Sequence, residues 1–372
     1  MMILPSIIIV LFVAYSVLII YYWLGWRNIP KFISPGKKNT TRISVIIPAR
    51  NEEANIRNLL ASLEQQTYNK DLYEVIVADD HSTDSTVEIV QQSRYARMVQ
   101  VPGEAIHSSK KKAIETGIGI AKGDLIVTTD ADCIAPKNWL QAIAAFKEEN
   151  NSVFIAAPVL VQHNSSLLQL FQTIDFLVLQ GITGASVHKR VHPMCNGANL
   201  AYEKKDFYEV NGFSGIDNIA SGDDMLLMNK MMKKYPNRVH YLKSKEAIVI
   251  TQPMKSWISF FRQRTRWASK VFYYKNMKIF LALLLVYLFN LSFLVLLAAG
   301  FAEPRYWIFL ACLWVGKTII EFPFVASVTS FFNRSSLLKY FFIFQPLHIL
   351  YTIIAGLMGQ TGKYEWKGRK VK

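Results

Sequence analysis

The sequence has little cysteine and lacks the glycine-rich loops that usually hold phosphates. Three of its 372 residues are cysteine, and their spacing fits neither a disulfide framework nor a zinc site. The first expected strand is followed by Pro48-Ala-Arg-Asn-Glu-Glu53, which contains no glycine. This excludes the dinucleotide-binding turn G-x-G-x-x-G. The P-loop pattern G-x-x-x-x-G-K-[ST] occurs nowhere. A bound nucleotide would therefore have to be held by carboxylates, with a metal at its diphosphate.

Charge is also missing from long runs at both ends of the chain. Residues 3–24 and 279–302 carry no charged side chain, and each run is long enough to cross about 30 Å of hydrocarbon. Residues 306–330 form a third apolar segment that contains Lys317 and Glu321, and residues 340–358 form a fourth. The first run has no basic stretch before it and no small-residue cleavage site, so we expect an uncleaved anchor rather than a signal peptide.

Basic residues outnumber acidic ones, 42 to 27, for a net charge of +15. They cluster beside the apolar segments, which favours anionic lipid headgroups over nucleic acid as the partner. The positive-inside rule then places the N-terminus outside and residues 25–278 in the cytoplasm. Four spanning segments would leave the basic C-terminal tail outside, so we expect residues 306–330 to be re-entrant or interfacial. The basic residues that follow the first run are Arg27, Lys31, Lys37, Lys38 and Arg42.

Between the apolar ends, short β-branched runs alternate with amphipathic stretches. This alternation predicts an α/β fold with a mostly parallel sheet covered on both faces, whose ligands bind at the carboxyl ends of the strands. We expect strands at residues 43–48, 74–78, 98–101, 124–132 and 153–161. We expect helices at residues 52–66, from a cap at Ser82 or Thr83 through Gln92, and at residues 110–121, 138–149 and 225–234.

Pairs of carboxylates follow two of these strands. Asp79 and Asp80 come directly after the second strand, where the alternative is an ordinary Asx turn. Asp130 and Asp132 stand two residues apart at the end of the 124–132 run, where an extended backbone would point them to the same side. Such a pair could hold a divalent cation and, through it, a diphosphate. Alternatively, it could cap the following helix.

Five motifs follow one another along the chain. They are Val45-Ile-Ile-Pro-Ala-Arg-Asn-Glu52, Val77-Ala-Asp-Asp-His-Ser-Thr-Asp84, Thr129-Asp-Ala-Asp132, Gly222-Asp-Asp224 and Gln263-Arg-Thr-Arg-Trp267. In this order, from residue 43 to about residue 250, the chain resembles the family 2 glycosyltransferases of the GT-A fold. The last motif is typical of membrane-embedded synthases of cellulose, chitin, hyaluronan and poly-N-acetylglucosamine. His81 departs from the pattern, because the family often has glycine there.

The resemblance implies a role for most of these residues on the donor side. One of Asp79 and Asp80 contacts the uracil or ribose of a nucleotide-sugar donor, and Asp130 and Asp132 hold Mg²⁺ or Mn²⁺ at its diphosphate. Lys110 lies near the diphosphate, unless it is part of a solvated charge run with its lysine neighbours. The expected donor-binding residues are Pro48, Glu52, Asp79, Asp80, Lys110, Asp130 and Asp132.

The acceptor side is implied in the same way. Asp224 is the catalytic base, with Asp223 as its neighbour, although carboxylates at a helix start are commonly dipole partners only. Trp267 stacks on the acceptor sugar, or anchors an amphipathic helix at the membrane interface. The stretch around Asn196 and Gly197 approaches a sugar, or is a simple turn. The expected acceptor-binding residues are Asn196, Gly197, Gln263, Arg266 and Trp267.

The resulting prediction is an inverting glycosyltransferase of the inner (plasma) membrane, with its catalytic domain in the cytoplasm. We expect it to move a UDP-linked sugar to a lipid or growing polysaccharide, and we expect envelope-biosynthesis partners. The alternative is a catalytically inactive nucleotide-sugar-binding partner of a polysaccharide export complex. The expected domains are an anchor at 1–25, a basic linker at 26–42, the GT-A domain at 43–252, an interfacial helix at 253–277, membrane segments at 278–358 and a basic tail at 359–372.

Overall fold

The computed structural model describes residues 3–36, 38–103, 109–164, 166–191, 194–217, 222–269, 276–359, 364–366 and 369–371. The chain forms two compact units. The first comprises Met1–Asn28, His163–His192 and Pro253–Lys372, and the second comprises Ile29–Gln162 and Pro193–Gln252. Residues 163–192, within the range predicted for the GT-A domain, thus belong to the unit of apolar helices.

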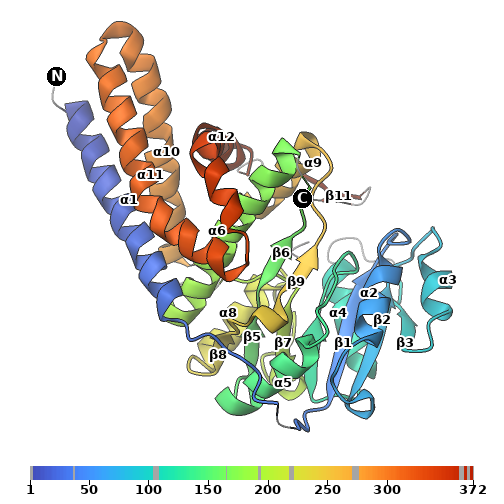
Figure 1. The fold of residues 1–372 in the computed structure, drawn as a ribbon. Helices are drawn as coiled ribbons and strands as arrows, with labels where there is room; N and C mark the ends of the chain where they lie inside the picture. Colours follow the sequence, from blue (N-terminus) through green and yellow to red (C-terminus); the bar gives the residue numbers. More distant parts are fainter. Residues whose placement is uncertain are drawn as a thin grey trace. The chain divides into compact units, whose positions relative to one another are not determined.

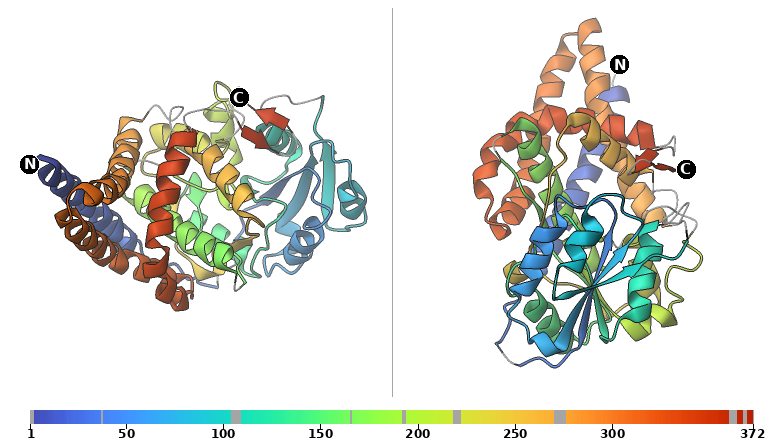
Figure 2. Two further views of the ribbon diagram at one scale, coloured as in Figure 1. Left: turned by 90° about the horizontal axis from the view of Figure 1, so that it is seen from above. Right: turned by 90° about the vertical axis from the view of Figure 1, so that its right-hand side faces the viewer.

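The second unit is built on a seven-stranded sheet, counted over the described residues, in the order β3-β2-β1-β4-β7-β5-β8. Its strands pair in parallel except β7, which is antiparallel to β4 and β5. Helices lie on both faces of the sheet (Figure 2), and β1 is buried almost without alternation, as both-sided covering requires. The predicted mostly parallel α/β fold is confirmed. The strands are β1 (Ile43–Ala49), β2 (Tyr73–Asp79), β3 (Ala96–Gln100), β4 (Leu125–Thr128), β5 (Phe154–Ala156), β7 (Leu200–Glu203) and β8 (Val239–Tyr241).

The helices of this unit connect the strands of the sheet. A separate two-stranded sheet pairs β6 (Val159–Val161) with β9 (Val249–Thr251). The helices are α2 (Ile56–Glu64), α3 (Thr86–Gln91), α4 (Ser109–Ile120), α5 (Trp139–Asn150), α7 (Lys204–Glu209) and α8 (Met225–Lys234).

Several predicted elements have different bounds in the structure. The strand predicted at 124–132 ends at Thr128, because the chain turns there and the Asp130 carbonyl accepts a hydrogen bond from the Cys133 amide at 3.1 Å. Asp130 and Asp132 therefore lie in a turn, and the argument from an extended backbone was wrong for them. The strand predicted at 153–161 is two strands in different sheets, with Pro158 between them.

Two predicted helix starts also differ. Helix α3 was predicted to follow a cap at Ser82 or Thr83, but it begins at Thr86, after Ser85. Ser82 and Thr83 instead bridge to the loop after β1, where the Asn51 amide donates to Ser82 Oγ and the Thr83 amide donates to Asn51 Oδ1. The helix predicted at 52–66 spans only Ile56–Glu64, because residues 52–55 form a loop.

The first unit consists mainly of long apolar helices. Helices α1, α10 and α11 lie side by side in Figure 1, and α12 packs against α9 and α10. Five of these helices are long and apolar enough to cross a membrane: α1, α6, α10, α11 and α12. The bounds are α1 (Ile3–Asn28), α6 (Leu167–Lys189), α9 (Trp257–Ala268), α10 (Met277–Ala302), α11 (Arg305–Phe331) and α12 (Leu338–Gly359), followed by the hairpin β10 (Tyr364–Trp366) and β11 (Arg369–Val371).

Helix α6 was absent from the predicted membrane segments, because polar residues such as Gln172 and Asp175 interrupt its apolar run. Its flanking strands argue against a single crossing. Strand β5 precedes α6 and β7 follows it, yet the two pair in one sheet. The chain must therefore leave that sheet and return to the same side. The other four candidates carry no such constraint.

Helix α11 is continuous through the segment predicted to be re-entrant, with Pro323 inside it. Lys317 and Glu321, the two charged residues inside that segment, pair with each other, Lys317 Nζ lying 2.7 Å from Glu321 Oε1. Gln345 of α12 bonds to both charged groups, and the Tyr15 hydroxyl of α1 donates to Glu321. This internal pairing explains how an apolar helix accommodates two charges.

Candidate active site

The candidate site lies at one edge of the seven-stranded sheet. Because β1, β2 and β4 are parallel, their carboxyl ends share this edge, and β1 is the switch point between β2 and β4. Strand β7 runs the other way and therefore begins here, with Leu200 opposite Thr128. The loops that carry the predicted donor residues and the Asn196-Gly197 stretch are thus brought to a common edge.

The two aspartates after β2 are buried. Asp79 Oδ2 accepts hydrogen bonds from the Ser82 amide at 3.2 Å and from Gln100 Nε2 at 3.1 Å. Its other oxygen, Oδ1, is buried and has no partner among the described residues. The Asp80 carboxylate pairs with Arg50 at 3.7 Å. A buried acceptor without a donor is costly, so Asp79 Oδ1 suits the N–H or hydroxyl of a ligand.

His81, at the position where the family often has glycine, adopts a positive φ of 56°. Glycine is favoured at such angles, so His81 holds this backbone conformation at some strain. The ring is held by contacts of Nε2 with the Gly103 carbonyl at 3.1 Å and of Nδ1 with Gln100 Nε2 at 3.4 Å.

Lys110 of α4 joins two of the predicted acidic motifs. Its Nζ lies 2.7 Å from Asp130 Oδ1 and 3.2 Å from Asp223 Oδ2. Burial lowers the pKa of Lys110, but the two carboxylates outweigh it, and the net shift is upward. The lysine is therefore a fixed positive charge between the two motifs rather than part of a solvated charge run.

The Gly222-Asp-Asp224 motif and the Asn196-Gly197 stretch meet at the same place. Asp224 caps α8, accepting from the Met225 amide at 2.7 Å through Oδ1 and from the Gly197 amide at 3.2 Å through Oδ2. Gly222 has a positive φ of 84°, which explains the glycine before the two aspartates. Asn196 orders its own loop by accepting from the Ala198 amide at 2.9 Å.

Gly197 is packed directly against this cluster. A Cβ atom at this position would lie 3.0 Å from Lys110 Nζ and 3.1 Å from Asp223 Oδ2. A side chain at residue 197 would therefore push Lys110 Nζ and the Asp223 carboxylate away by a few tenths of an ångström.

Asp132 lies close to two other acidic groups. Burial raises the pKa of its carboxyl to about 6, and the nearby charges of Asp130 and Glu52 contribute. A divalent cation would relieve this repulsion. Within the described ranges, no group of three or more His, Cys, Asp or Glu side chains could hold a metal ion alone. The neighbouring carboxylates of Asp130 and Asp132 fit a cation such as Mg²⁺, which takes one or two carboxylates and completes its shell with water and phosphate.

The remaining predicted residues are divided between the two units. Pro48 is near the end of β1, and Glu52 follows in the loop, where its carboxylate accepts from Asn55 at 2.9 Å. Gln263, Arg266 and Trp267 are partly exposed on α9, which starts at Trp257 because Ser256 forms a capping box with Ser259. Residues 270–275 of the predicted interfacial helix, and half of the predicted tail, are outside the described residues.

Some contacting residues were missed by sequence reasoning. Arg50 and Gln100 bind the carboxylates at the end of β2. Arg50 lies inside the first motif but was given no role, and no local pattern distinguishes Gln100 from a surface residue. Asp175 and Arg264 form a buried ion pair in the first unit. Asp175 did carry a signal, since a lone acidic residue in an apolar helix needs a partner.

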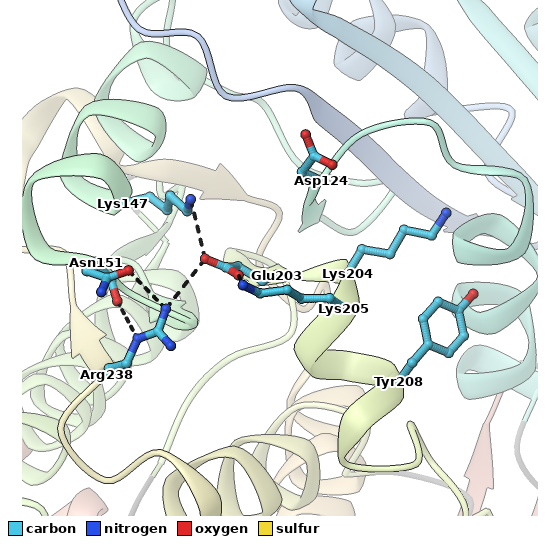
Figure 3. A pocket seen from close by; sticks show the side chains of 8 residues that line it. All are labelled: Asp124, Lys147, Asn151, Glu203, Lys204, Lys205, Tyr208 and Arg238. Carbon is cyan, nitrogen blue, oxygen red and sulfur yellow. Dashed lines mark hydrogen bonds and ion pairs between the residues drawn. The ribbon is translucent and has the colours of Figure 1, made fainter.

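A second charged surface pocket lies at the opposite edge of the sheet (Figure 3). Asp124 precedes β4 and Glu203 ends β7, so this pocket is at the far ends of the strands from Asp130. The Glu203 carboxylate lies 3.3 Å from Lys147, 3.1 Å from Lys205 and 3.7 Å from Arg238. Burial raises the pKa of Glu203, but Lys205, Lys147 and a hydrogen bond with Asp206 outweigh it and lower the pKa overall. We interpret the cluster as a structural clamp.

Replacing Glu203 with Gln is expected to lower the free energy of unfolding at pH 7 by about 1–3 kcal/mol, because three cations lose their shared partner. A lowered pKa means that the stabilisation is present above the ordinary Glu value of about 4.3 and is lost below it. Thermal unfolding of the full chain should show the difference shrinking as the pH falls below 4. Glu209→Gln, in an exposed pair with Lys234, is the control and should change little. Equal effects of the two substitutions would contradict the clamp.

Comparison with known proteins agrees with this architecture. Residues 44–210 match the family model described as Glycosyl transferase family 2. The probable glycosyltransferase YdaM of Bacillus subtilis is 28% identical over 255 residues, which cover 67% of this chain and 59% of YdaM. The poly(ribitol-phosphate) β-N-acetylglucosaminyltransferase TarS of Staphylococcus aureus is 35% identical over 112 residues, 30% of this chain and 20% of TarS. The chain thus spans only part of the length of these relatives.

A solved structure shares the fold over most of the chain. The mannosyltransferase PcManGT from Pyrobaculum calidifontis, in complex with GDP-Man and Mn²⁺, matches with a TM-score of 0.62 and 19% identity. The match covers 95% of this chain and 99% of PcManGT. At this identity the likeness supports the fold alone.

Proposed function

We propose that this protein, whose residues 44–210 match the family model described as Glycosyl transferase family 2, is an inverting sugar transferase at a membrane surface. It moves a sugar from a nucleotide-sugar donor to a lipid or a growing polysaccharide. The observation that carries the proposal is the cluster at the sheet edge. There Lys110 links Asp130 to Asp223, and Gly197 bonds to Asp224.

On the donor side, the nucleotide lies over the carboxyl ends of β1, β2 and β4. Asp79 offers its buried Oδ1 to the base or ribose, in keeping with a uridine nucleotide. Lys110 supplies positive charge beside the diphosphate and holds Asp130 in place. Asp132 and Asp130 would hold Mg²⁺ or Mn²⁺, which when bound neutralises charge on the leaving nucleoside diphosphate.

On the acceptor side, Asp224 removes the proton from the attacking hydroxyl. The backbone amides of Gly197 and Met225 fix its carboxylate and leave each oxygen with a further lone pair for that proton. Attack in line with the departing diphosphate inverts the anomeric centre. Trp267, Gln263 and Arg266 on α9 bind the acceptor.

Membrane attachment is supported by the apolar helices α1, α10, α11 and α12. The basic residues after α1 support a cytoplasmic second unit by the positive-inside rule, and nucleotide sugars are available there. The acceptor class is supported by relatives whose names specify poly(ribitol-phosphate) and a glucosylated diacylglycerol.

The test is a transfer assay with the full chain in detergent. Labelled UDP-N-acetylglucosamine, UDP-glucose and GDP-mannose are each offered with Mg²⁺ or Mn²⁺ and one of three acceptors: undecaprenyl phosphate, diacylglycerol or poly(ribitol-phosphate). The expected result is one labelled product, identified by mass spectrometry, with inverted anomeric configuration. Donor binding without turnover in any combination would instead support the inactive nucleotide-sugar-binding partner.

Replacing Gly197 with Ala is expected to lower the transfer rate by about tenfold or more, because the new Cβ displaces Lys110 and Asp223. The matched control is Gly119→Ala on α4, where a Cβ would meet nothing within 4 Å. That change should stabilise the helix by about 0.5–1 kcal/mol and leave the rate unchanged. Transfer rates and melting temperatures of both variants check this. A Gly197→Ala enzyme with the wild-type rate would show that the cluster tolerates displacement.

A further inference from the structure

A buried ion pair in the first unit is not explained by the roles assigned above. Arg264 Nη2 of α9 lies 2.5 Å from Asp175 Oδ2 of α6, and both side chains are almost fully buried. Burying two charges costs several kcal/mol per ion, and such pairs are often no more stabilising than apolar residues of similar size. A contribution to the stability of the fold is therefore a weak explanation for the presence of this ion pair.

Arg264 also contacts the aromatic side chains on either side of it along α9. Its guanidinium carbon lies 4.2 Å from the centroid of the Trp267 ring and 4.9 Å from that of Phe260. These residues are three and four positions from Arg264 and so share one face of the helix. The cation therefore stacks on one face of the Trp267 indole, and the Trp267 side chain is partly exposed.

Helix α6 contributes two neighbouring residues to this arrangement. Asp175 holds the guanidinium, and the Phe176 ring lies 6.3 Å from the Trp267 ring, centroid to centroid. The indole is thus held by a stacked cation that is itself held by a carboxylate.

Phe260, which Arg264 contacts, is enclosed by aromatic side chains of two other helices. It is fully buried, and its ring centroid lies 5.7 Å from that of Phe171 on α6 and 5.4 Å from that of Tyr351 on α12. His348 of α12 lies 4.0 Å from the second oxygen of Asp175. Three helices therefore fix the pair from which Arg264 reaches Trp267.

We infer that Asp175 and Arg264 are positioning residues, which hold the Trp267 indole so that an acceptor sugar stacks on the face away from Arg264. The consequence for the acceptor rests on the proposed function, in which Trp267 contacts the acceptor. The planar guanidinium of Arg264 can stack on a ring and pair with a carboxylate at the same time. A lysine ammonium combines these two contacts less well.

The variants are chosen to separate positioning from folding. Arg264→Gln and Asp175→Asn each break the pair. The double variant Asp175→Leu/Arg264→Met replaces it with apolar groups, a change that folded proteins often tolerate. Arg262→Gln is the matched control, because Arg262 is exposed on the same helix.

The first measurement follows the indole without any substrate. The full chain is labelled with 5-fluorotryptophan, and the Trp267 resonance is assigned from its loss in Trp267→Phe. We expect this resonance to shift in Arg264→Gln and in the double variant, and to stay in place in Arg262→Gln. An unchanged resonance in the folded double variant would overturn the inference.

The second measurement uses the donor and acceptor that the wild type turns over in the panel above. We expect the acceptor KM of the double variant to rise about tenfold, with the donor KM unchanged. A shifted resonance with an unchanged acceptor KM would overturn the link to the acceptor. A wild type that transfers no sugar would refute the proposed function, while the fluorine resonance would still decide whether the pair holds the indole.

Discussion

Replacing Asp224 with Ser is expected to lower the rate of sugar transfer by about 10²–10⁴-fold while leaving the protein folded. A positioned general base contributes an effect of this size, and serine cannot take the proton at neutral pH. Serine does retain the second role of this residue, because it is a good helix N-cap and can still accept a backbone hydrogen bond at the start of α8.

The choice of serine separates two explanations of the same residue. If Asp224 only caps α8, Asp224→Ser should keep both rate and melting temperature, and Asp224→Ala should lose about 1 kcal/mol of stability. If Asp224 is the base, both variants lose turnover and only Asp224→Ala is also destabilised. Donor affinity, measured by titration with the nucleotide, should change little in either variant, since the base acts on the acceptor.

Asp223 offers a contrast within the same motif. Its carboxylate lies 3.2 Å from Lys110, so it acts mainly through that lysine. The two neighbouring aspartates thus differ by contact: Asp224 is fixed by two backbone amides, and Asp223 by a cation. In the sequence only the motif resemblance separates them, because both open the same helix.

The predictable part of the molecule is the part with local patterns. Alternating β-branched and amphipathic runs identified the parallel sheet, and carboxylates directly after two strands placed the site, because carboxyl ends of parallel strands share an edge. The exact turn after β4 was not predictable. The Asp130 carbonyl bonds to the Cys133 amide, and nothing in the β-branched run signals where that turn begins.

Contacts between distant segments were the other gap. Arg264 and Asp175 belong to different helices, and neither stands at a fixed position of a motif. Lys110 was ambiguous for the same reason, since three consecutive lysines look alike until two carboxylates select one of them. Helix α6 was missed because its polar side chains, buried against neighbouring helices, weaken the apolar signal.

Removing divalent metal is expected to lower transfer by at least about 100-fold, and adding Mg²⁺ or Mn²⁺ back should restore it. The reason is charge: the protein's own cation at this place is Lys110, and it is already paired with Asp130 and Asp223. A leaving diphosphate carries more negative charge than a shared lysine can balance. Chelation by EDTA, followed by titration of each metal, measures the effect.

Asp132→Asn tests which carboxylate binds the metal. It should raise the metal concentration needed for half-maximal rate by about 10–100-fold, while saturating metal recovers much of the rate. Lys110→Met should instead lower the rate at every metal concentration, because Lys110 positions Asp130 and Asp223 whether or not metal is bound. Transfer that survives EDTA would contradict the metal role of Asp132. In that case the positive charge at the diphosphate must come from Lys110, and Lys110→Met becomes the variant with the larger loss.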